Sequence, residues 1–279
     1  MVTEQMIAEG LRALGLGASS TVIVHASLRS FGNVQGGAPI VCRALIGACG
    51  TLLLPAGTWD LTGVPAPPGL VRPHNAGGAA TTWAAFDAAL ARATPYAADL
   101  PIDRELGRIP ETMRRGFAHR RSPHPLLSYL AVGRFADALS GAQRLDRPLG
   151  PLEALAVRGG DVLLLGVSHT ANTAIHLAEQ RLGRSRFYRY AKAAQEVWME
   201  LPNIPGQSHH FDDIERELAS VTHEVLIGTC RARRIAVADV LATAERLITA
   251  DPAALLCADS ECRCFAALQQ RVAWLTSRP

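Results

Sequence analysis

Thr173, His176 and Glu179 follow one another at steps of three residues, a spacing that could bring three reactive side chains together. On a helix these positions share one face, so a hydroxyl, an imidazole and a carboxylate would be neighbours. An imidazole can accept a proton near neutral pH, and a carboxylate can orient its ring. The pattern predicts a proton-transfer site. The plainer alternative is a helix cap followed by a partly exposed histidine and glutamate.

Two elements must position these side chains. The segment 161–167 is short, apolar and preceded by two glycines, which predicts a buried strand. The chain becomes polar at 168–170, and from about residue 172 its apolar residues recur on one helical face. A strand that feeds a helix through a polar turn places side chains at the carboxyl edge of a sheet, where α/β proteins carry their sites.

Apolar strands and helices alternate through the first two thirds of the chain, which predicts an α/β fold with three layers, α/β/α. After residue 182, the segments 187–194 and 197–201 alternate like antiparallel strands, and a hairpin at 223–237 precedes a helical tail. We therefore expect an α/β core over residues 1–183 and a C-terminal α+β cap over 184–279. One continuous domain is the alternative.

The composition narrows the class of protein. The 279 residues, with 48% hydrophobic side chains and a net charge of +3, fit an ordinary globular α/β protein. Aromatic residues make up only 5%, which disfavours stacking on single-stranded nucleic acid. A signal peptide is not predicted, and no apolar run reaches the ~18 residues of a membrane span. We expect a soluble, cytoplasmic monomer or homodimer that binds neither nucleic acid nor membranes.

The six cysteines are expected as free thiols in a cytosolic protein. Cys257, Cys262 and Cys264 form the pattern C-x4-C-x-C, which is a poor spacing for zinc. A fourth ligand such as His223 would have to come from far along the chain. The sequence therefore predicts no metal ion.

Several other segments could contact a ligand. The glycines at 36–37, after the predicted strand 21–28, could offer backbone N–H groups to a carbonyl or phosphate, or simply form a tight turn. The long segment 57–78 is rich in Pro and Gly and could form a site wall. The arginines at 114–121 could bind phosphate or form a solvated face.

Near the N-terminus, the stretch R-A-L-G-L-G-A at 12–18 superficially matches the acetyl-CoA loop of the GNAT acetyltransferases. A phosphate-binding loop should open a helix after a strand. Here the glycines follow a predicted helix at 3–14, which indicates a helix C-cap instead. A GNAT fold is therefore not predicted.

Five segments, in one order along nearly the whole chain, resemble the aminoglycoside 3-N-acetyltransferase family, whose fold is unrelated to GNAT. They are VHASLRSFGNVQGG (24–37), GTLLLPAGT (50–58), GRIPETMRR (107–115), RSPHPLLSYLAVG (121–133) and LLLGVSHTANTAIHLAE (163–179). The resemblance implies an antibiotic acetyltransferase-like fold, acetyl-CoA as donor, and a small-molecule amine, on an aminoglycoside, as acceptor.

The resemblance also implies roles for individual residues. His176 would be the general base, Glu179 would orient it, and Thr173 would lie beside the thioester. The first segment resembles the family's wall around the acetyl group and pantetheine arm, which implies donor contacts by Ser27, Leu28 and Arg29. The segment from 121 resembles the region that contacts the phosphates and pantetheine of CoA, which implies contacts by Arg121, Ser122, His124 and Ser128.

One position departs from the family pattern. Many members carry an acidic residue six positions before the histidine, and this chain has Thr170 there. A cationic sugar needs carboxylates, so other acidic residues would have to replace that charge. The candidates are Asp60, Asp99, Asp212 and Asp213, although acidic residues in loops are usually just solvated.

The implied mechanism is direct acetyl transfer in a ternary complex, without a covalent enzyme intermediate. The base removes a proton from the amine, and N–H or hydroxyl donors meet the charge on the thioester oxygen. Three alternatives remain: transfer to another kind of amine, a metal-dependent hydrolase that uses His169 and the H-x-x-E pattern, and a non-catalytic CoA-binding protein.

Overall fold

The computed structural model of the protein describes residues 1–70, 72, 75 and 78–277. Its strands are β1 Thr21–Ala26, β2 Thr51–Pro55, β3 Gly63–Val64, β4 Arg120–Arg121, β5 Tyr129–Gly133, β6 Asp161–Leu165, β7 Phe187–Ala194, β8 Val197–Ile204, β9 His223–Ile227 and β10 Cys230–Ala236. Seven of them form one sheet in the order β4-β5-β2-β1-β6-β10-β9. The central strands β2, β1 and β6 are parallel, and the strands outside them are antiparallel.

The helices complete the architecture. The α-helices are α1 Glu4–Ala13, α2 Ala38–Ala48, α3 Trp59–Thr62, α4 Trp83–Arg92, α5 Arg108–Gly116, α6 Ala136–Gly141, α7 Gly150–Val157, α8 Thr173–Arg181, α9 Glu215–Leu218, α10 Val237–Ala250 and α11 Arg263–Thr276. The 3₁₀ helices are η1 Leu28–Phe31, η2 Arg104–Leu106, η3 His169–Ala171, η4 Phe211–Ile214 and η5 Ala219–Val221. Within the described residues, every helix falls short of the length and hydrophobicity that a membrane span requires.

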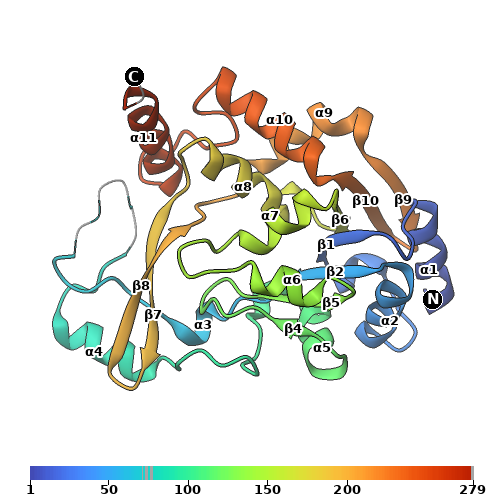
Figure 1. Ribbon diagram of the computed structural model, residues 1–279, viewed down its shortest axis with the longest axis horizontal. Coiled ribbons are helices and arrows are strands. Elements are labelled where there is room, and N and C mark those ends of the chain that lie inside the picture. Colours follow the sequence, from blue (N-terminus) through green and yellow to red (C-terminus); the bar gives the residue numbers. More distant parts are fainter. Residues whose placement is uncertain (71, 73–74, 76–77, 278–279) are drawn as a thin grey trace.

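Helices cover both faces of the large sheet (Figure 1). Successive strand residues point to opposite faces, so Val22 and Val24 pack in one core and Ile23 in the other. The first core includes α1, α2 and α5, and the second includes α7, α8 and α10. The predicted three-layer α/β/α fold is confirmed. Gly15, at φ +77°, follows α1, so this glycine-containing stretch ends a helix as predicted.

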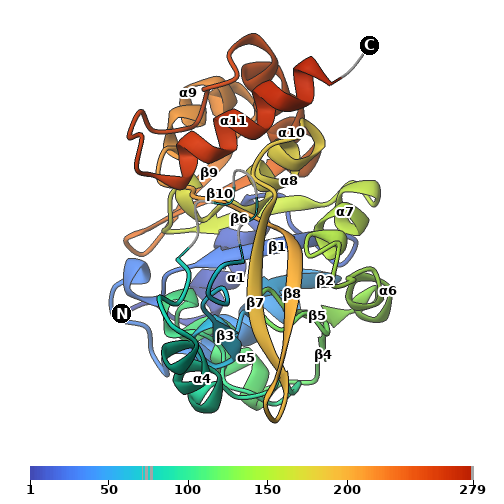
Figure 2. The same cartoon turned by 90° about the vertical axis from the view of Figure 1, so that its left-hand side faces the viewer.

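A second, smaller sheet stands beside the large one, in the order β3-β7-β8. Its long β7–β8 ribbon runs between the side of α10 and α11 and the side of α4 (Figure 2). Trp198 contacts Phe86 of α4 with ring centroids 5.8 Å apart, and Lys192 Nζ donates to the carbonyl of Leu90 at 2.9 Å. At the opposite end, Phe187 packs against Ala266 of α11. The segment after β2 is thus built into the smaller sheet, because its strand β3 pairs with β7.

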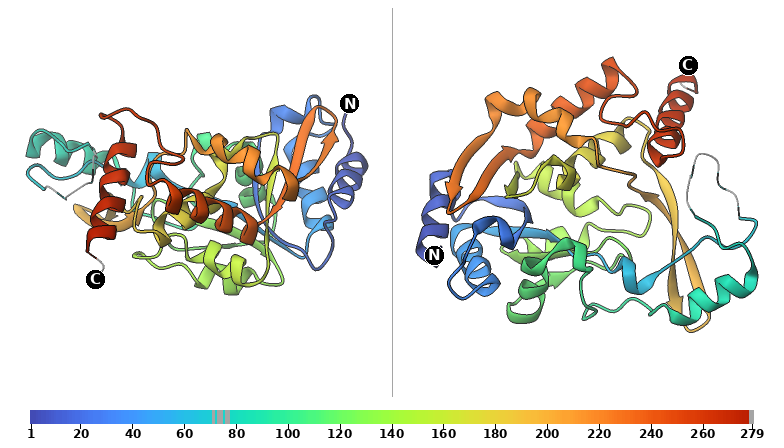
Figure 3. Two further views of the ribbon diagram at one scale, coloured as in Figure 1. Left: turned by 90° about the horizontal axis from the view of Figure 1, so that it is seen from above. Right: turned by 180° about the vertical axis from the view of Figure 1, so that it is seen from behind.

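The C-terminal part of the chain also contributes to the large sheet. β10 pairs antiparallel with β6, with Ile235 opposite Val162, and β9 pairs with β10. Figure 3 shows this hairpin next to the N-terminal helix, with α11 toward the other end of the molecule. The large sheet therefore contains strands from both sides of the expected boundary near residue 183. The hairpin expected in a cap instead covers the edge of β6, because its buried residues Ala232 and Ile235 complete the two cores.

Gly166, immediately after β6, is a position where only glycine fits. Its φ is +65°, and an added Cβ would lie 1.9 Å from Ser30 Oγ. The change Gly166→Ala should lower the free energy of unfolding by roughly 2–4 kcal/mol, because a left-handed backbone and an overpacked contact both add to the loss. Gly159 has the same φ but no atom within 4 Å of the built Cβ. In urea unfolding, Gly159→Ala should lower the free energy of unfolding by only about 1–2 kcal/mol. Equal losses in the two variants would contradict a close contact between residue 166 and Ser30.

Candidate active site

A cleft of about 670 Å³ opens at the edge of the sheet where the parallel strands β1, β2 and β6 end. Ala26 and Pro55, the last residues of β1 and β2, line it together with Val167. Parallel strands end at one edge, and this edge is where α/β proteins place their sites. Thr173 and His176 of α8 line the same cleft.

Asn172 fixes the start of α8 against the cleft. Its side-chain oxygen accepts a hydrogen bond from the N–H of Ala174 at 3.2 Å, as a helix N-cap does. Its side-chain nitrogen lies 3.2 Å from Nδ1 of His169, which ties the cap to η3. Asn172 is buried and lines the cleft. The first helical residue, Thr173, is thereby held at the cleft wall.

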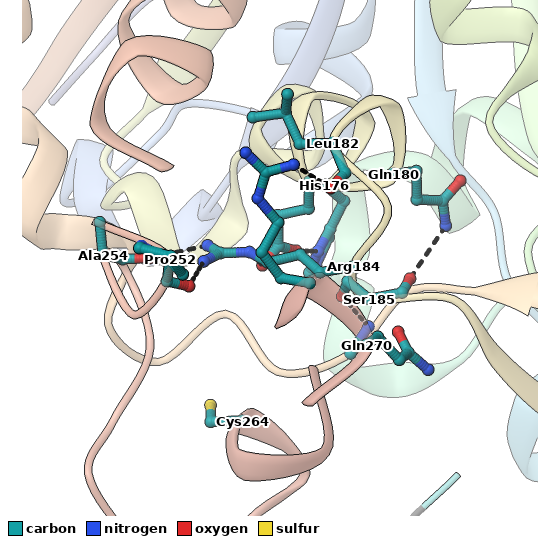
Figure 4. A network of polar contacts seen from close by, with 12 residues as sticks. His176, Gln180, Leu182, Arg184, Ser185, Pro252, Ala254, Cys264 and Gln270 are labelled. Atoms are coloured by element: carbon teal, nitrogen blue, oxygen red, sulfur yellow. Dashed lines mark hydrogen bonds and ion pairs between the residues drawn. The ribbon is translucent and has the colours of Figure 1, made fainter. Parts of the chain in front are cut away.

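His176, Glu179 and Arg184 form a chain of hydrogen bonds. Figure 4 shows His176 and Arg184 in this network, with Pro252 and Ala254 beside the Arg184 guanidinium. His176 Nδ1 lies 2.8 Å from Glu179 Oε2, and Arg184 Nε donates to Glu179 Oε1 at 3.1 Å. Glu179 and Arg184 are fully buried, whereas 13% of the His176 side chain is exposed. Arg184 also donates to the carbonyls of Pro252 at 2.8 Å and Ala254 at 2.7 Å. With its Nδ1 proton directed to a carboxylate, His176 keeps Nε2 as its basic nitrogen.

Two other histidines at this edge of the sheet are poorly suited to act as a base. Burial lowers the pKa of His25, which lines the cleft, to about 3. Burial also lowers the pKa of His169 to about 4, and nearby Arg233 acts in the same direction. A base with such a low pKa holds a proton from an amine too weakly at neutral pH. Of these three histidines, His176 is the one that both lines the cleft and has a carboxylate beside Nδ1.

Acidic side chains gather on the wall built by α3 and η2. Asp60, Asp103 and Glu105 all line the cleft. The Asp103 carboxylate accepts hydrogen bonds from the N–H groups of Trp59 at 2.7 Å and Asp60 at 3.0 Å, which fixes the start of α3. Burial raises the pKa of Asp103, and these two donors oppose the shift. Of these three acidic residues, the sequence predicted only Asp60 as a substrate contact, because Asp103 and Glu105 lie in a segment without a periodic pattern.

Ser27, Leu28 and Arg29, the predicted contacts of acetyl-CoA, directly follow Ala26 in the chain, but Ala26 rather than these three lines the cleft. Ser27 and Leu28 are half-buried, and Arg29 is exposed. The Ser27 N–H donates to the carbonyl of Leu165 at 3.0 Å, so the fold itself uses this donor. This turn is therefore a poorer source of N–H donors for a thioester oxygen than the sequence suggested.

Arg121, a predicted CoA contact, forms several hydrogen bonds within the chain. Its guanidinium donates to the carbonyls of Ala98 at 3.1 Å and Ala56 at 2.6 Å, and also to the carbonyl of Leu100. Nε donates to the hydroxyl of Ser128 at 3.1 Å. All three nitrogens of the fork thus have partners within the chain.

Ser122 and His124, two further predicted contacts of CoA, have fully buried side chains. The Ser122 hydroxyl accepts from the N–H of Tyr129 at 2.8 Å, and His124 Nδ1 accepts from the N–H of Leu126 at 3.1 Å. These bonds shape the loop between β4 and β5. Of the four residues predicted in this segment, Ser128 lines the cleft.

Thr170, at the position where many family members are acidic, lines the cleft and lies next to a carboxylate. Its N–H donates to Asp212 Oδ1 at 3.2 Å. Asp213 instead pairs with His210, with 3.3 Å between Oδ2 and Nδ1, and Asp99 lies in an exposed loop. Among the predicted acidic residues, Asp60 therefore lines the cleft and Asp212 adjoins it.

A fourth candidate metal ligand does lie beside the three C-terminal cysteines, and it is His209 rather than the suggested His223. His209 Nε2 lies 3.7 Å from Cys264 Sγ and 3.9 Å from Cys262 Sγ, and Cys257 completes the cluster. His223 instead begins β9. His209 lies in a loop about 50 residues before the cysteines, so spacing along the chain gave no signal for it.

Known proteins are similar to this chain in both sequence and fold. The family model for aminoglycoside 3-N-acetyltransferase matches residues 23–249. The aminoglycoside N(3')-acetyltransferase-like protein YokD of Bacillus subtilis is 30% identical over 81% of this chain and 84% of its own length. The aminoglycoside N(3)-acetyltransferase VII of Streptomyces paromomycinus is 35% identical over 76% of this chain and 74% of its own.

Solved structures extend the similarity to the whole fold. The aminoglycoside acetyltransferase AAC(3)-IVa apoenzyme superposes with a TM-score of 0.76 at 26% identity, over 97% of this chain and 98% of that chain. A histidine-to-alanine mutant of AAC(3)-IVa in complex with a gentamicin gives 0.75 at 25% identity, with the same coverage. The chain therefore belongs to the aminoglycoside 3-N-acetyltransferase family.

Proposed function

We propose that the protein moves the acetyl group of acetyl-CoA directly to the 3-amino group of an aminoglycoside, with His176 as the general base. Acetyl transfer to an aminoglycoside amine is the activity of its family. The observation that carries the proposal is the His176–Glu179–Arg184 chain, which holds an imidazole at the cleft with Nδ1 already occupied.

The reaction needs one proton acceptor and one leaving group. The amine nitrogen attacks the thioester carbonyl, its N–H proton passes to His176 Nε2, and Glu179 stabilises the imidazolium. The C–S bond then breaks, and the CoA thiolate leaves and takes up the proton held by His176, which returns the imidazole to its neutral form. An amide forms as the thioester is consumed, so atoms and charges balance without a covalent enzyme intermediate.

Thr173 is the best-placed donor for the thioester oxygen. It occupies the first position of α8 and lines the cleft with His176. Negative charge on the oxygen would develop near the N-terminus of this helix, where the helix dipole favours it. Acetyl-CoA would enter past Ser27, Leu28 and Arg29 on one side and Ser128 on the other.

The acceptor would occupy the acidic part of the cleft. An aminoglycoside carries several ammonium groups, and Asp60 and Glu105 present carboxylates on one wall, whereas the Asp103 carboxylate binds N–H groups of α3. Asp212, held by the N–H of Thr170, adds a third carboxylate beside the cleft. Opposite charges within a few ångströms steer and orient such a ligand.

Replacing Asp60 should weaken binding of the aminoglycoside without affecting binding of acetyl-CoA. Asp60→Asn should raise KM for the aminoglycoside roughly 10–100-fold, about the effect of losing one charged hydrogen bond, with KM for acetyl-CoA unchanged. Asp213→Asn is the matched control, because Asp213 pairs with His210 instead of lining the cleft. Steady-state kinetics with each substrate varied measures both constants. Equal effects of the two substitutions would contradict the acidic wall.

The test of the proposed function is an acetyl-CoA consumption assay with a panel of aminoglycosides and simpler amines. We expect release of the CoA thiol only when an aminoglycoside is present, with the acceptor gaining one acetyl group by mass spectrometry. Acetylation of simple amines alone would indicate another acceptor class. Thiol release without any amine would indicate a hydrolase, and CoA binding without release would indicate a binding protein. Each of these outcomes would overturn the proposal.

A further inference from the structure

Four side chains that could bind a metal converge at the C-terminal side of the cleft. The ligand atoms of His209, Cys257, Cys262 and Cys264 all lie within 4.8 Å of one another. His209 comes from the loop after β8, Cys257 and Cys262 from the segment between α10 and α11, and Cys264 from the first turn of α11. The cluster thus joins parts of the chain that are far apart in sequence.

The distances fit a tetrahedral metal ion. Zinc with sulfur ligands at ~2.3 Å and a nitrogen ligand at ~2.0 Å holds its donor atoms roughly 3.5–3.8 Å apart. His209 Nε2 is 3.7 Å from Cys264 Sγ and 3.9 Å from Cys262 Sγ. All six cysteines of the chain are free thiols, so no disulfide competes for these sulfurs. Three cysteines and one histidine are a common ligand set of structural zinc sites.

A metal ion at this cluster would stabilise a segment that has no secondary structure of its own. The segment between α10 and α11 contains no helix or strand. The first part of this segment is held by Arg184 and by Leu255, which packs in the second large core. Nearer the cysteines, in the described part of the chain, the apolar cluster consists of Phe187, Ala266 and Ala267, with Leu256 packed against it. Leu255 also holds the left-handed conformation, with φ +64°. A small apolar cluster stabilises such a segment weakly, and metal ligation would add to it.

The cluster also adjoins the active-site cleft. Ser208, directly before His209, and Arg263, between Cys262 and Cys264, both line the cleft. Phe211, two residues after His209, packs edge-on against the His176 ring with 4.7 Å between ring centroids. Restraining His209 would therefore restrain a cleft wall and a neighbour of the base.

We propose that His209, Cys257, Cys262 and Cys264 bind one Zn²⁺ ion tetrahedrally and so fix this wall of the cleft. Zinc binds the three sulfurs as thiolates, and their protons pass to solvent. Four protein ligands leave no open position for a substrate, so the ion is structural rather than catalytic. Zinc binding does not depend on the proposed acetyl transfer, and its test uses metal content.

The test compares two adjacent histidines. Protein purified under reducing conditions without chelator should contain about one zinc per chain by plasma mass spectrometry. His209→Ala should fall below roughly a fifth of that value, because three ligands hold zinc far more weakly than four. His210→Ala is the matched control, since His210 is exposed in the same loop and pairs with Asp213. It should keep wild-type zinc.

A second pair of variants and a measurement on the wild-type protein guard against misfolding. Cys262→Ala should lose zinc and Cys49→Ala should keep it, because Cys49 lies in the core away from the cluster. In the wild-type protein, a thiol-blocking reagent should release zinc to a metal-sensitive dye, and chelation should lower Tm. A wild-type protein that holds no zinc after incubation with Zn²⁺ under reducing conditions would overturn the proposal. Equal zinc content in His209→Ala and His210→Ala would do the same.

Discussion

His176→Ala should lower kcat for acetyl transfer by roughly 10²–10⁴-fold, because the amine then loses the group that accepts its proton during attack. Among the histidines at the sheet edge, His176 combines exposure to the cleft with a carboxylate on Nδ1. His25 cannot substitute, because burial lowers its pKa to about 3. The measurement is thiol release from acetyl-CoA at a saturating aminoglycoside concentration.

Two controls separate loss of the base from loss of the fold. His176→Ala should bind CoA with wild-type affinity in calorimetry. His119→Ala should keep wild-type kcat, since His119 contacts the carbonyl of Phe117 through Nδ1 instead of lining the cleft. A kcat for His176→Ala within about threefold of the wild-type value would show that His176 is not the base, since a functioning base contributes at least ~10²-fold to the rate.

Arg184→Leu should lower the free energy of unfolding by roughly 3–5 kcal/mol, because it leaves one partner of a buried ion pair without its counter-charge. Arg184 and Glu179 are both fully buried, and the guanidinium also binds the carbonyls of Pro252 and Ala254. Burial lowers the pKa of Arg184, and the Glu179 carboxylate is the chief group opposing that shift. Urea unfolding measures the loss.

The matched control for this substitution is Arg181, the last residue of α8, three positions earlier in the chain. Arg181 pairs with Glu245 at the surface, where 45% and 35% of the side chains are exposed. Arg181→Leu should therefore cost at most about 1 kcal/mol. In addition, Glu179→Leu combined with Arg184→Leu should lose less than the sum of the single changes. A loss below about 1 kcal/mol in Arg184→Leu would show that the pair does not stabilise the fold.

The local elements of the site could be predicted because each leaves a strong pattern. The apolar run at 161–167 predicted a strand, and the helical period of apolar residues from about residue 172 predicted a helix; β6 and α8 agree within two residues. The i, i+3 spacing likewise predicted that His176 and Glu179 would be neighbours, and their side chains lie 2.8 Å apart. These relations depend on residues close in sequence.

Relations between distant residues could not be predicted. Arg184 binds carbonyls almost 70 residues away, and His209 meets cysteines about 50 residues later, so no short pattern contains either contact. The hairpin at 223–237 was recognisable, but its docking on β6 depends on which edge is free. In the segment 120–128, residue types alone did not show that Ser122 and His124 point inward.

The central claim is that His176 Nε2 receives the proton of an amine that attacks acetyl-CoA inside this cleft. The most direct measurement is a crystal structure of the protein with CoA and an aminoglycoside bound together. The account predicts the reacting amine about 2.6–3.2 Å from His176 Nε2, with the CoA sulfur on the other side of the amine. A complex in which the amines lie outside the cleft, or in which His176 contacts neither ligand, would contradict it.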